Sequence, residues 1–199
     1  MIEIYNVASA HGRFQPLHFG HVEYLLAAKQ RCRFLYVGVT QYVRSRLEDT
    51  FDRAPHRAEP ICNPMTFFER QAMIRDVLLE CGVPLTEFGV IPFPIEDIAI
   101  LPEFLPQEVP ILTTICEEWN REKVARLRAA DYAVEVLYAD RERAYSGTEI
   151  RRLIMTGDTK WKDLVPLSTI RWIERVGMEQ RLLDAAGRSQ SVSEHDQID

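Results

Sequence analysis

The sequence predicts an α/β fold in which helices cover both faces of a parallel sheet. Strand-like and helix-like segments alternate along the chain, which is typical of parallel strands joined by crossover helices. The chain has 199 residues, of which 46% are hydrophobic, so it can bury the core of a full domain. Two polar motifs each follow a strand-like run, and open sheets of this class bind ligands at such positions. These observations indicate a doubly wound, Rossmann-like sheet.

Each strand and helix is predicted from its own residue pattern. Short apolar runs predict strands over 2–10, 33–40, 87–93, 110–115 and 132–138. Periodic apolar positions predict helices over 22–29, 66–81 and 120–130, one from 148 to near 157, and one over 168–185. Thr66 and Glu69 have the spacing of a capping box, and Gly157 is a typical helix stop. We expect one enzyme domain over 1–187 and a disordered polar tail over 188–199.

Composition and charge exclude several classes of protein. A net charge of −6 does not provide the basic face that a non-specific nucleic-acid binder needs, although local arginines can line a nucleotide cleft. No apolar stretch reaches the length of a membrane span, and the N-terminus has no signal-like segment. The cysteines form no CxxC pair and indicate reduced thiols: Cys32, Cys62, Cys81 and Cys116. We therefore expect a cytoplasmic protein that binds neither nucleic acid nor membrane.

The most informative segment is the motif GRFQPLHFGH over residues 12–21, between the first strand and the first helix. The N–H groups at a helix start favour an anion. His18 and His21 share one helix face because they are three residues apart, and Gly20 lets a ligand approach the backbone. The motif therefore indicates a phosphate site. A nicotinamide-dependent dehydrogenase is disfavoured because no GxGxxG follows the first strand.

A second motif, YSGTEIRR over residues 145–152, follows the last predicted strand. Ser146 or Thr148 can cap the helix, and Glu149 has capping-box spacing with Ser146. Arg151 lies in the first turn, where its guanidinium can hold phosphate oxygens in a bidentate pair. Alone, this motif would favour an ordinary capped helix with a solvated arginine. Because both motifs follow strands, we expect them to meet in one crevice.

The two motifs resemble the HxGH and SxTxxR elements of the nucleotidylyltransferase superfamily, in the forms of archaeal-type nicotinamide mononucleotide (NMN) adenylyltransferases. NPMTFFER over 63–70 and PIEDI over 94–98 extend this resemblance. It implies that the histidines stabilise charge at the α-phosphate and that the arginines hold the β- and γ-phosphates. The implied catalytic residues are Arg13, His18, His21 and Arg151, and the implied nucleotide-binding residues are Gly12, Phe14, Gln15, Gly20, Ser146 and Thr148.

The segment expected to bind the acceptor departs from the archaeal pattern. That family usually continues after PI-x-D-I with an asparagine that binds the nicotinamide amide, and then a tryptophan that stacks on the ring. Here Leu101 stands in place of the asparagine and cannot hydrogen-bond an amide, whereas Phe104 can still stack. The expected acceptor-binding residues are Asp97, Leu101 and Phe104.

Two further features are interpreted from the residues. Glu69 and Arg70 of NPMTFFER are interpreted as a helix cap and a solvated charge. Extra residues between Gln41 and Asn63 form either a mobile lid that brings cations to the acceptor phosphate or a solvated surface loop. The cations of that segment are Arg44, Arg46, Arg53, His56 and Arg57.

The implied reaction is in-line transfer of a nucleoside monophosphate to a phosphorylated small-molecule acceptor, with release of pyrophosphate. ATP is the favoured nucleoside triphosphate and NMN the favoured acceptor. Mg²⁺ is expected, bound mainly through substrate phosphates, with no metal-ligating residues assigned in the protein. Two alternatives stay open: a cytidylyltransferase acting on a small phosphate or phosphonate, which Leu101 favours, and a non-catalytic nucleotide-binding regulatory domain. The sequence also leaves open whether the chain forms a homo-oligomer.

Overall fold

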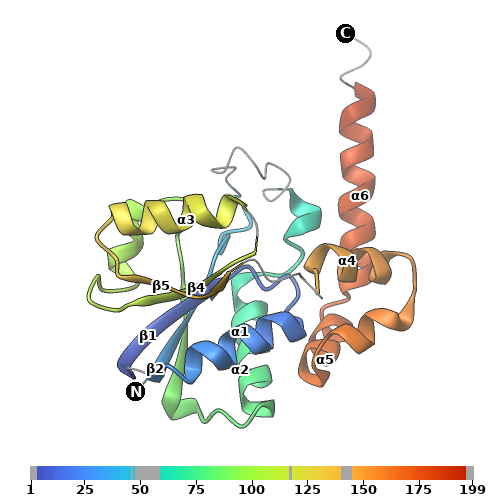
Figure 1. Ribbon diagram of the computed structural model, residues 1–199. Coiled ribbons are helices and arrows are strands. Elements are labelled where there is room, and N and C mark those ends of the chain that lie inside the picture. Colours follow the sequence, from blue (N-terminus) through green and yellow to red (C-terminus); the bar gives the residue numbers. More distant parts are fainter. Residues whose placement is uncertain (1–3, 46, 48–58, 117, 140–144, 196–199) are drawn as a thin grey trace.

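Five parallel strands form one sheet in the order β3-β2-β1-β4-β5. The computed structural model describes residues 4–45, 47, 59–116, 118–139 and 145–195. Its strands are β1 (Tyr5–Gly12), β2 (Cys32–Val39), β3 (Phe88–Pro92), β4 (Ile111–Ile115) and β5 (Val134–Ala139). Helices lie on both sides of this sheet (Figure 1), so the predicted doubly wound fold is confirmed.

The helices form two layers and a separate group. α1 (Phe19–Lys29) and α2 (Phe67–Glu80) lie on one side of the sheet, and α3 (Glu118–Ala129) lies on the other (Figure 1). α4 (Gly147–Met155), α5 (Leu167–Arg175) and α6 (Met178–His195) gather beside α2. Short 3₁₀ helices were not predicted; they are η2 (Pro60–Cys62), η3 (Leu85–Glu87), η4 (Ile98–Glu103) and η5 (Thr159–Leu164).

The core is divided by the sheet into two clusters. Ala8 and Ala10 of β1 belong to the larger cluster, beneath α1 and α2. Ile111 of β4 belongs to the smaller cluster, which includes Leu127 of α3. Because β1 leads into a helix on one face and β4 into a helix on the other, their carboxyl ends form the crevice where such sheets bind ligands.

The C-terminal region differs from the prediction. A single helix over 168–185 was expected, but the chain turns at Gly177, whose φ is +61°, and divides into α5 and α6. α6 also continues to His195, past the expected start of the tail at Arg188. The division into domain and tail stays a prediction, since residues 196–199 lie outside the described part. No helix in that part is both long and apolar enough to cross a membrane.

α5 is anchored to α2 by polar side chains. The Glu80 carboxylate accepts hydrogen bonds from the backbone N–H groups of Leu167 and Ser168, at 3.2 and 2.7 Å. These are two of the unpaired donors at the start of α5. Trp172 Nε1 donates to the Asp76 carboxylate at 2.8 Å. The C-terminal helices are thereby held against the body of the protein.

Candidate active site

The turn after β1 is built around the ring of Phe14. Phe14 is fully buried and has a φ of +51°, which is uncommon for a bulky residue. A Cβ on Gly12 would lie 2.9 Å from this ring, so glycine lets the ring fold back under the end of the strand. The Phe14 side chain therefore anchors the turn, with its ring centroid 4.9 Å from that of His21, and its contact with a nucleotide stays a prediction.

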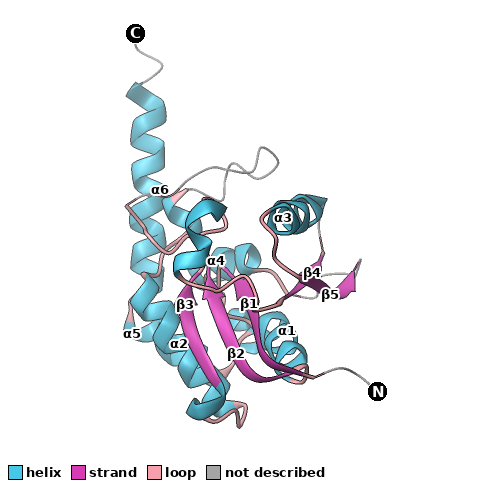
Figure 2. Cartoon of the chain, turned by 90° about the vertical axis from the view of Figure 1, so that its left-hand side faces the viewer, coloured by secondary structure: helices cyan, strands magenta, loops and turns pink. Residues whose placement is uncertain are grey.

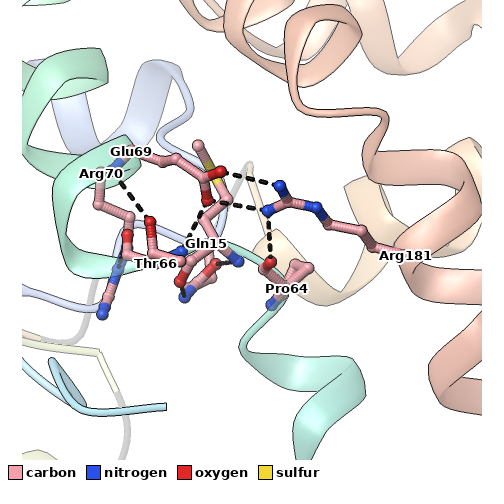
Figure 3. A network of polar contacts seen from close by, with 7 residues as sticks. Gln15, Pro64, Thr66, Glu69, Arg70 and Arg181 are labelled. Carbon is pink, nitrogen blue, oxygen red and sulfur yellow. Dashed lines mark hydrogen bonds and ion pairs between the residues drawn. The ribbon is translucent and has the colours of Figure 1, made fainter.

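Gln15 connects this turn to the segment before α2. Its Nε2 donates to the Met65 carbonyl oxygen at 2.8 Å, and its Oε1 accepts from the Met65 N–H at 2.9 Å. Gln15 lies beside Pro64 and Thr66 in Figure 3. Its amide thus bonds within the protein and positions the motif, and its contact with a nucleotide stays a prediction.

The two histidines of the motif lie together at the start of α1. The ring centroids of His18 and His21 are 3.7 Å apart, with the rings stacked. The backbone N–H of His18 donates to Nδ1 of His21 at 3.3 Å. With Nδ1 as acceptor, a neutral His21 carries its proton on Nε2, where it can be donated to a ligand oxygen. The catalytic role of this pair stays a prediction.

The two motifs are in direct contact, as expected. Arg151 Nη1 donates to the Gln15 carbonyl oxygen at 2.7 Å, across 136 residues of sequence. A Cβ on Gly147 would lie 3.3 Å from the same oxygen, so glycine allows this close approach. A Cβ on Gly20 would lie 3.3 Å from the His18 ring and 3.4 Å from Tyr145. α4 consequently lies at the carboxyl end of β1 (Figure 2).

Arg151 is buried, with 4% of its surface exposed, so the alternative of a solvated arginine is wrong. Its Nη2 lies 3.3 Å from Thr148 Oγ1 and 3.5 Å from Cys62 Sγ. Burial lowers the pKa of Arg151, and the neighbouring Cys62 thiol opposes this shift. Three hydrogen bonds to described residues use three of the five guanidinium N–H donors. The two others are suited to phosphate oxygens.

The predicted cap of α4 is wrong. Ser146 is the N-cap residue by position, but its side chain makes no capping hydrogen bond. Glu149 pairs with Arg152 instead, at 2.6 and 2.8 Å. The N–H groups at the start of α4 are therefore not occupied by a capping box, and anion binding there by Ser146 and the exposed Thr148 stays a prediction.

Arg70 was interpreted as a solvated charge, and this is wrong because its side chain is fully buried. Its guanidinium donates to the carbonyl oxygens of Arg13 at 3.0 Å, Thr40 at 2.7 Å and Gln41 at 2.7 Å. Burial lowers the pKa of Arg70 to about 10. The spacing carried a signal: Arg70 stands four residues before the buried Ile74, on the same face of α2. Arg70 therefore joins the turns after β1 and β2.

The interpretation of Glu69 as a helix cap is confirmed. Glu69 accepts from the Thr66 N–H at 2.8 Å, and Thr66 Oγ1 accepts from the Glu69 N–H at 3.2 Å. The same carboxylate pairs with Arg181 of α6 at 2.8 Å through both oxygens (Figure 3). Burial raises the pKa of Glu69, but the hydrogen bonds from Arg181 and Thr66 outweigh it and lower the pKa to about 2. α6 is thus tied to the segment that holds Gln15.

The three expected acceptor residues lie along η4 and its two ends, and their side chains differ in exposure. Leu101 is fully buried in the smaller core cluster, together with Phe93 and Leu105, so its side chain does not face an acceptor, contrary to the prediction. Asp97 is exposed at the start of η4. Phe104 is half-buried, and its ring centroid lies 6.0 Å from that of Tyr42. Of the three, Asp97 and Phe104 remain candidates.

Most of the cationic segment after β2 falls outside the described residues, including Arg46, Arg53, His56 and Arg57. Arg44 is described and exposed. Burial has the largest effect on the pKa of Arg70. The charges of Glu96 and Arg44 have the next largest effects. A described cation of this segment therefore lies near the turns that Arg70 joins, whereas the choice between lid and solvated loop stays open.

The family follows from comparison with known proteins. A family model described as cytidylyltransferase-like matches residues 9–153, which include both motifs. The chain belongs to this family. A phosphonoformate cytidylyltransferase from Streptomyces viridochromogenes is 37% identical over 173 residues, covering 86% of this chain and 92% of that protein. A nicotinamide-nucleotide adenylyltransferase from Saccharolobus solfataricus is 30% identical over 179 residues, covering 88% and 94%.

A solved structure with a similar fold is a bifunctional NMN adenylyltransferase/ADP ribose pyrophosphatase from Francisella tularensis. The TM-score is 0.65 at 17% sequence identity, with 98% of this chain and 56% of that chain covered. The chain thus spans about half the length of that protein, and the likeness supports the fold alone. The cytidylyltransferase-like chain is a nucleotidyltransferase, as its named relatives are, and the alternative of a non-catalytic regulatory domain has no support.

Proposed function

We propose that this nucleotidyltransferase transfers a cytidylyl group from CTP to a small phosphonate or phosphate and releases pyrophosphate. The observation that carries the proposal is the burial of Leu101. The residue that would hydrogen-bond a nicotinamide amide is replaced by an apolar side chain that belongs to the core. A pocket without that polar group lacks the hydrogen bond by which it would select NMN over acceptors that have no amide. The name of the phosphonoformate cytidylyltransferase relative, at 37% identity, supports the same acceptor class.

The chemistry rests on positioning and on neutralising charge. An acceptor oxygen attacks the α-phosphorus in line, the bond to the bridging oxygen breaks, and pyrophosphate leaves with the electron pair. In this proposal, His21 donates from Nε2 to an α-phosphate oxygen, with its ring held by the His18 N–H. His18 stacks on it and adds a second imidazole at the start of α1. Arg13 and Arg151 hold the β- and γ-phosphates.

We propose that Mg²⁺ enters mainly as an ion carried by the nucleotide phosphates. Among the described residues, no three or more His, Cys, Asp and Glu side chains are grouped so that they could hold a metal. Mg²⁺ keeps several waters and is commonly bound by substrate phosphates and one or two carboxylates. When bound, the ion would neutralise charge on the phosphate oxygens.

NMN adenylyl transfer is the second candidate, and a specific observation favours it. Phe104 keeps an aromatic ring in the acceptor segment, 6.0 Å from the ring of Tyr42. An exposed face of an aromatic ring can stack on a flat heterocycle. The adenylyltransferase relatives near 30% identity support the same interpretation. It still requires that a group other than Leu101 hold the amide.

The test is a screen of pyrophosphate release. Purified protein with Mg²⁺ is incubated with each of ATP, CTP, GTP and UTP and with phosphonoformate, phosphonoacetate, glycerol phosphate and NMN. The proposal expects CTP with a small phosphonate or phosphate to be the best pair. A kcat/KM for ATP and NMN of about 10⁴ M⁻¹s⁻¹ or more, above every CTP pair, would establish the second candidate instead.

A further inference from the structure

The strands β1 and β4 are held apart at the crevice by a hydroxyl group from α1. They pair at Ser9–Ile111 and Ala10–Leu112. At the next residue, the His11 N–H donates to the Tyr24 hydroxyl at 3.0 Å, and this hydroxyl donates to the Leu112 carbonyl oxygen at 2.7 Å. The Tyr24 oxygen therefore lies between two strands that would otherwise pair directly. The separation begins at His11, one residue before the end of β1.

The His11 imidazole is buried without a hydrogen-bond partner. The residue is 5% exposed, and among the described residues neither Nδ1 nor Nε2 has a donor or acceptor within hydrogen-bond distance. The ring stacks on Phe93, with centroids 4.2 Å apart and planes 5° from parallel. Buried polar atoms are nearly always hydrogen-bonded, because an unmade bond costs free energy. Because His11 stands where β1 and β4 separate, its two bare nitrogens are candidates for bonding to a ligand in the crevice.

A buried cation accompanies this ring. Lys123 of α3 is 6% exposed. Burial lowers the pKa of His11 well below its ordinary value, and the charge of Lys123 lowers it further. The imidazole is therefore neutral at pH 7, with one N–H donor and one acceptor nitrogen. An N–H donor in the field of a positive charge suits an anionic oxygen.

The position of the ring favours the acceptor over the nucleotide. Phe93, on which His11 stacks, directly follows β3 and begins the segment that leads to Asp97 and Phe104. His11 belongs to the face of β1 opposite Ala10, whose face packs under α1. His18 and His21 lie at the start of α1. The nucleotide phosphates and the His11 ring are thus expected on different sides of the crevice.

We propose that His11, in the positive field of Lys123, determines acceptor specificity by binding a second acidic group of the acceptor, such as a carboxylate. This inference rests on the proposed function and narrows it from small phosphonates to those that carry an additional oxyanion. In-line transfer uses the phosphonate oxygen as nucleophile, so the second group is held at a distance from the reacting atoms and sets orientation.

The experiment is a cycle of two acceptors and two proteins. Wild type and His11→Phe, which keeps a ring on Phe93 and removes both nitrogens, are assayed with CTP and either phosphonoformate or methylphosphonate. Loss of a charge-assisted hydrogen bond should lower kcat/KM for phosphonoformate by about tenfold or more, with a change below about threefold for methylphosphonate. The affinity for CTP, measured by calorimetry, should stay within about twofold.

Ser9→Ala is the matched control. Ser9 lies two residues earlier on the same face of β1, and its Oγ is also buried without a partner among the residues that the structure describes. Removal of the Ser9 hydroxyl should leave kcat/KM unchanged for both phosphonoformate and methylphosphonate. If His11→Phe does not fold, as judged by circular dichroism and melting temperature, His11→Val is used in its place.

The outcomes separate the inference from the proposed function. Wild type that turns over phosphonoformate while the His11 variant loses nothing overturns the inference alone. Equal losses with both acceptors, or a weaker affinity for CTP, also overturn it, because His11 would then be structural or would contact the nucleotide. Wild type that turns over neither phosphonate but accepts a small phosphate with CTP overturns the inference alone. Wild type that turns over no small phosphonate or phosphate with CTP overturns the proposed function and the inference together.

Discussion

The two sides of the crevice, which we propose bind the triphosphate and the acceptor, are constructed differently. On the triphosphate side, the start of α1 presents His18 and His21, and Arg151 of α4 is fixed by the Gln15 carbonyl oxygen. On the acceptor side, the segment after β3 contributes Leu101 to the core and leaves Asp97 exposed. The first side is held by polar contacts between distant motifs, and the second mainly by apolar packing.

This difference indicates how a cytidylyltransferase-like chain can change its acceptor. Nucleotidyl transfer from any triphosphate requires neutralisation of the same charge at the same phosphorus. Few residues of the triphosphate side can therefore be substituted without loss of the reaction. The acceptor side can exchange a hydrogen-bonding side chain for an apolar one without affecting that chemistry. Such an exchange alters which molecule reacts and leaves the reaction itself the same.

The largest effect is expected on the triphosphate side. His21→Ala removes the donor that we propose stabilises charge developing in the transition state, so kcat should fall by about 10²-fold or more. His21 is only half-buried, and the melting temperature should change little. The measurement is pyrophosphate release at saturating substrates.

His18→Ala should show a similar loss, because the two rings stack. Because these histidines lie on the triphosphate side, neither variant should change the order of the acceptors when they are ranked by kcat/KM. Turnover of purified His21→Ala near the wild-type rate would show that this motif does not act on the α-phosphate.

Leu101→Asn tests the acceptor side by restoring the residue that archaeal-type NMN adenylyltransferases usually have. Because Leu101 is fully buried in the core, an amide there loses apolar packing and finds no partner. The free energy of unfolding should fall by about 3 kcal/mol, measured by urea denaturation. NMN turnover should not rise, since the side chain does not face the crevice. A stable Leu101→Asn protein that gains NMN activity would show that position 101 binds the acceptor.

Arg151→Lys probes the contact between the motifs. Lysine keeps the charge but cannot donate in a fork, so the nucleotide dissociation constant should rise by about tenfold, measured by calorimetry. The melting temperature should fall by a few degrees as well, because the bond to the Gln15 carbonyl oxygen is broken. Arg152→Lys is the control: it changes the next arginine, which is exposed and pairs with Glu149, and it should change neither quantity. Equal effects of both substitutions would contradict the assignment.

The strands and the two motifs could be predicted from the sequence because each depends on local pattern. The apolar runs form strands as predicted, and α4 stops before Gly157, where φ is +68°. The roles of Phe14 and Arg70 could not be predicted in this way. Both depend on tertiary burial: a ring under Gly12 and a guanidinium among backbone carbonyls of other segments. The break at Gly177 was hidden because one amphipathic pattern continues across it.

The smallest effect concerns the ion pair that ties α6 to the triphosphate side. The pKa of Glu69 is about 2 in the folded protein, against about 4.3 in an unfolded chain, so the paired carboxylate stabilises the fold above pH 4.3. This stabilisation is lost as the pH falls from about 4.3 toward 2, because the unfolded chain takes up the proton first. Glu69→Gln should therefore lower the free energy of unfolding at pH 7 by about 1–2 kcal/mol, with solvent screening allowed for.

The difference in free energy of unfolding between wild type and Glu69→Gln, measured by urea denaturation, should shrink steadily between pH 5 and pH 3. Glu174→Gln serves as the control, since Glu174 pairs with Lys162 at 2.8 Å in an exposed position, where such a pair contributes little. Its substitution should have an effect near zero at every pH. A Glu69→Gln difference that stays constant from pH 7 to pH 3 would mean that the carboxylate acts only as a hydrogen-bonding cap of α2. α6 would then be held to the triphosphate side by packing and not by charge.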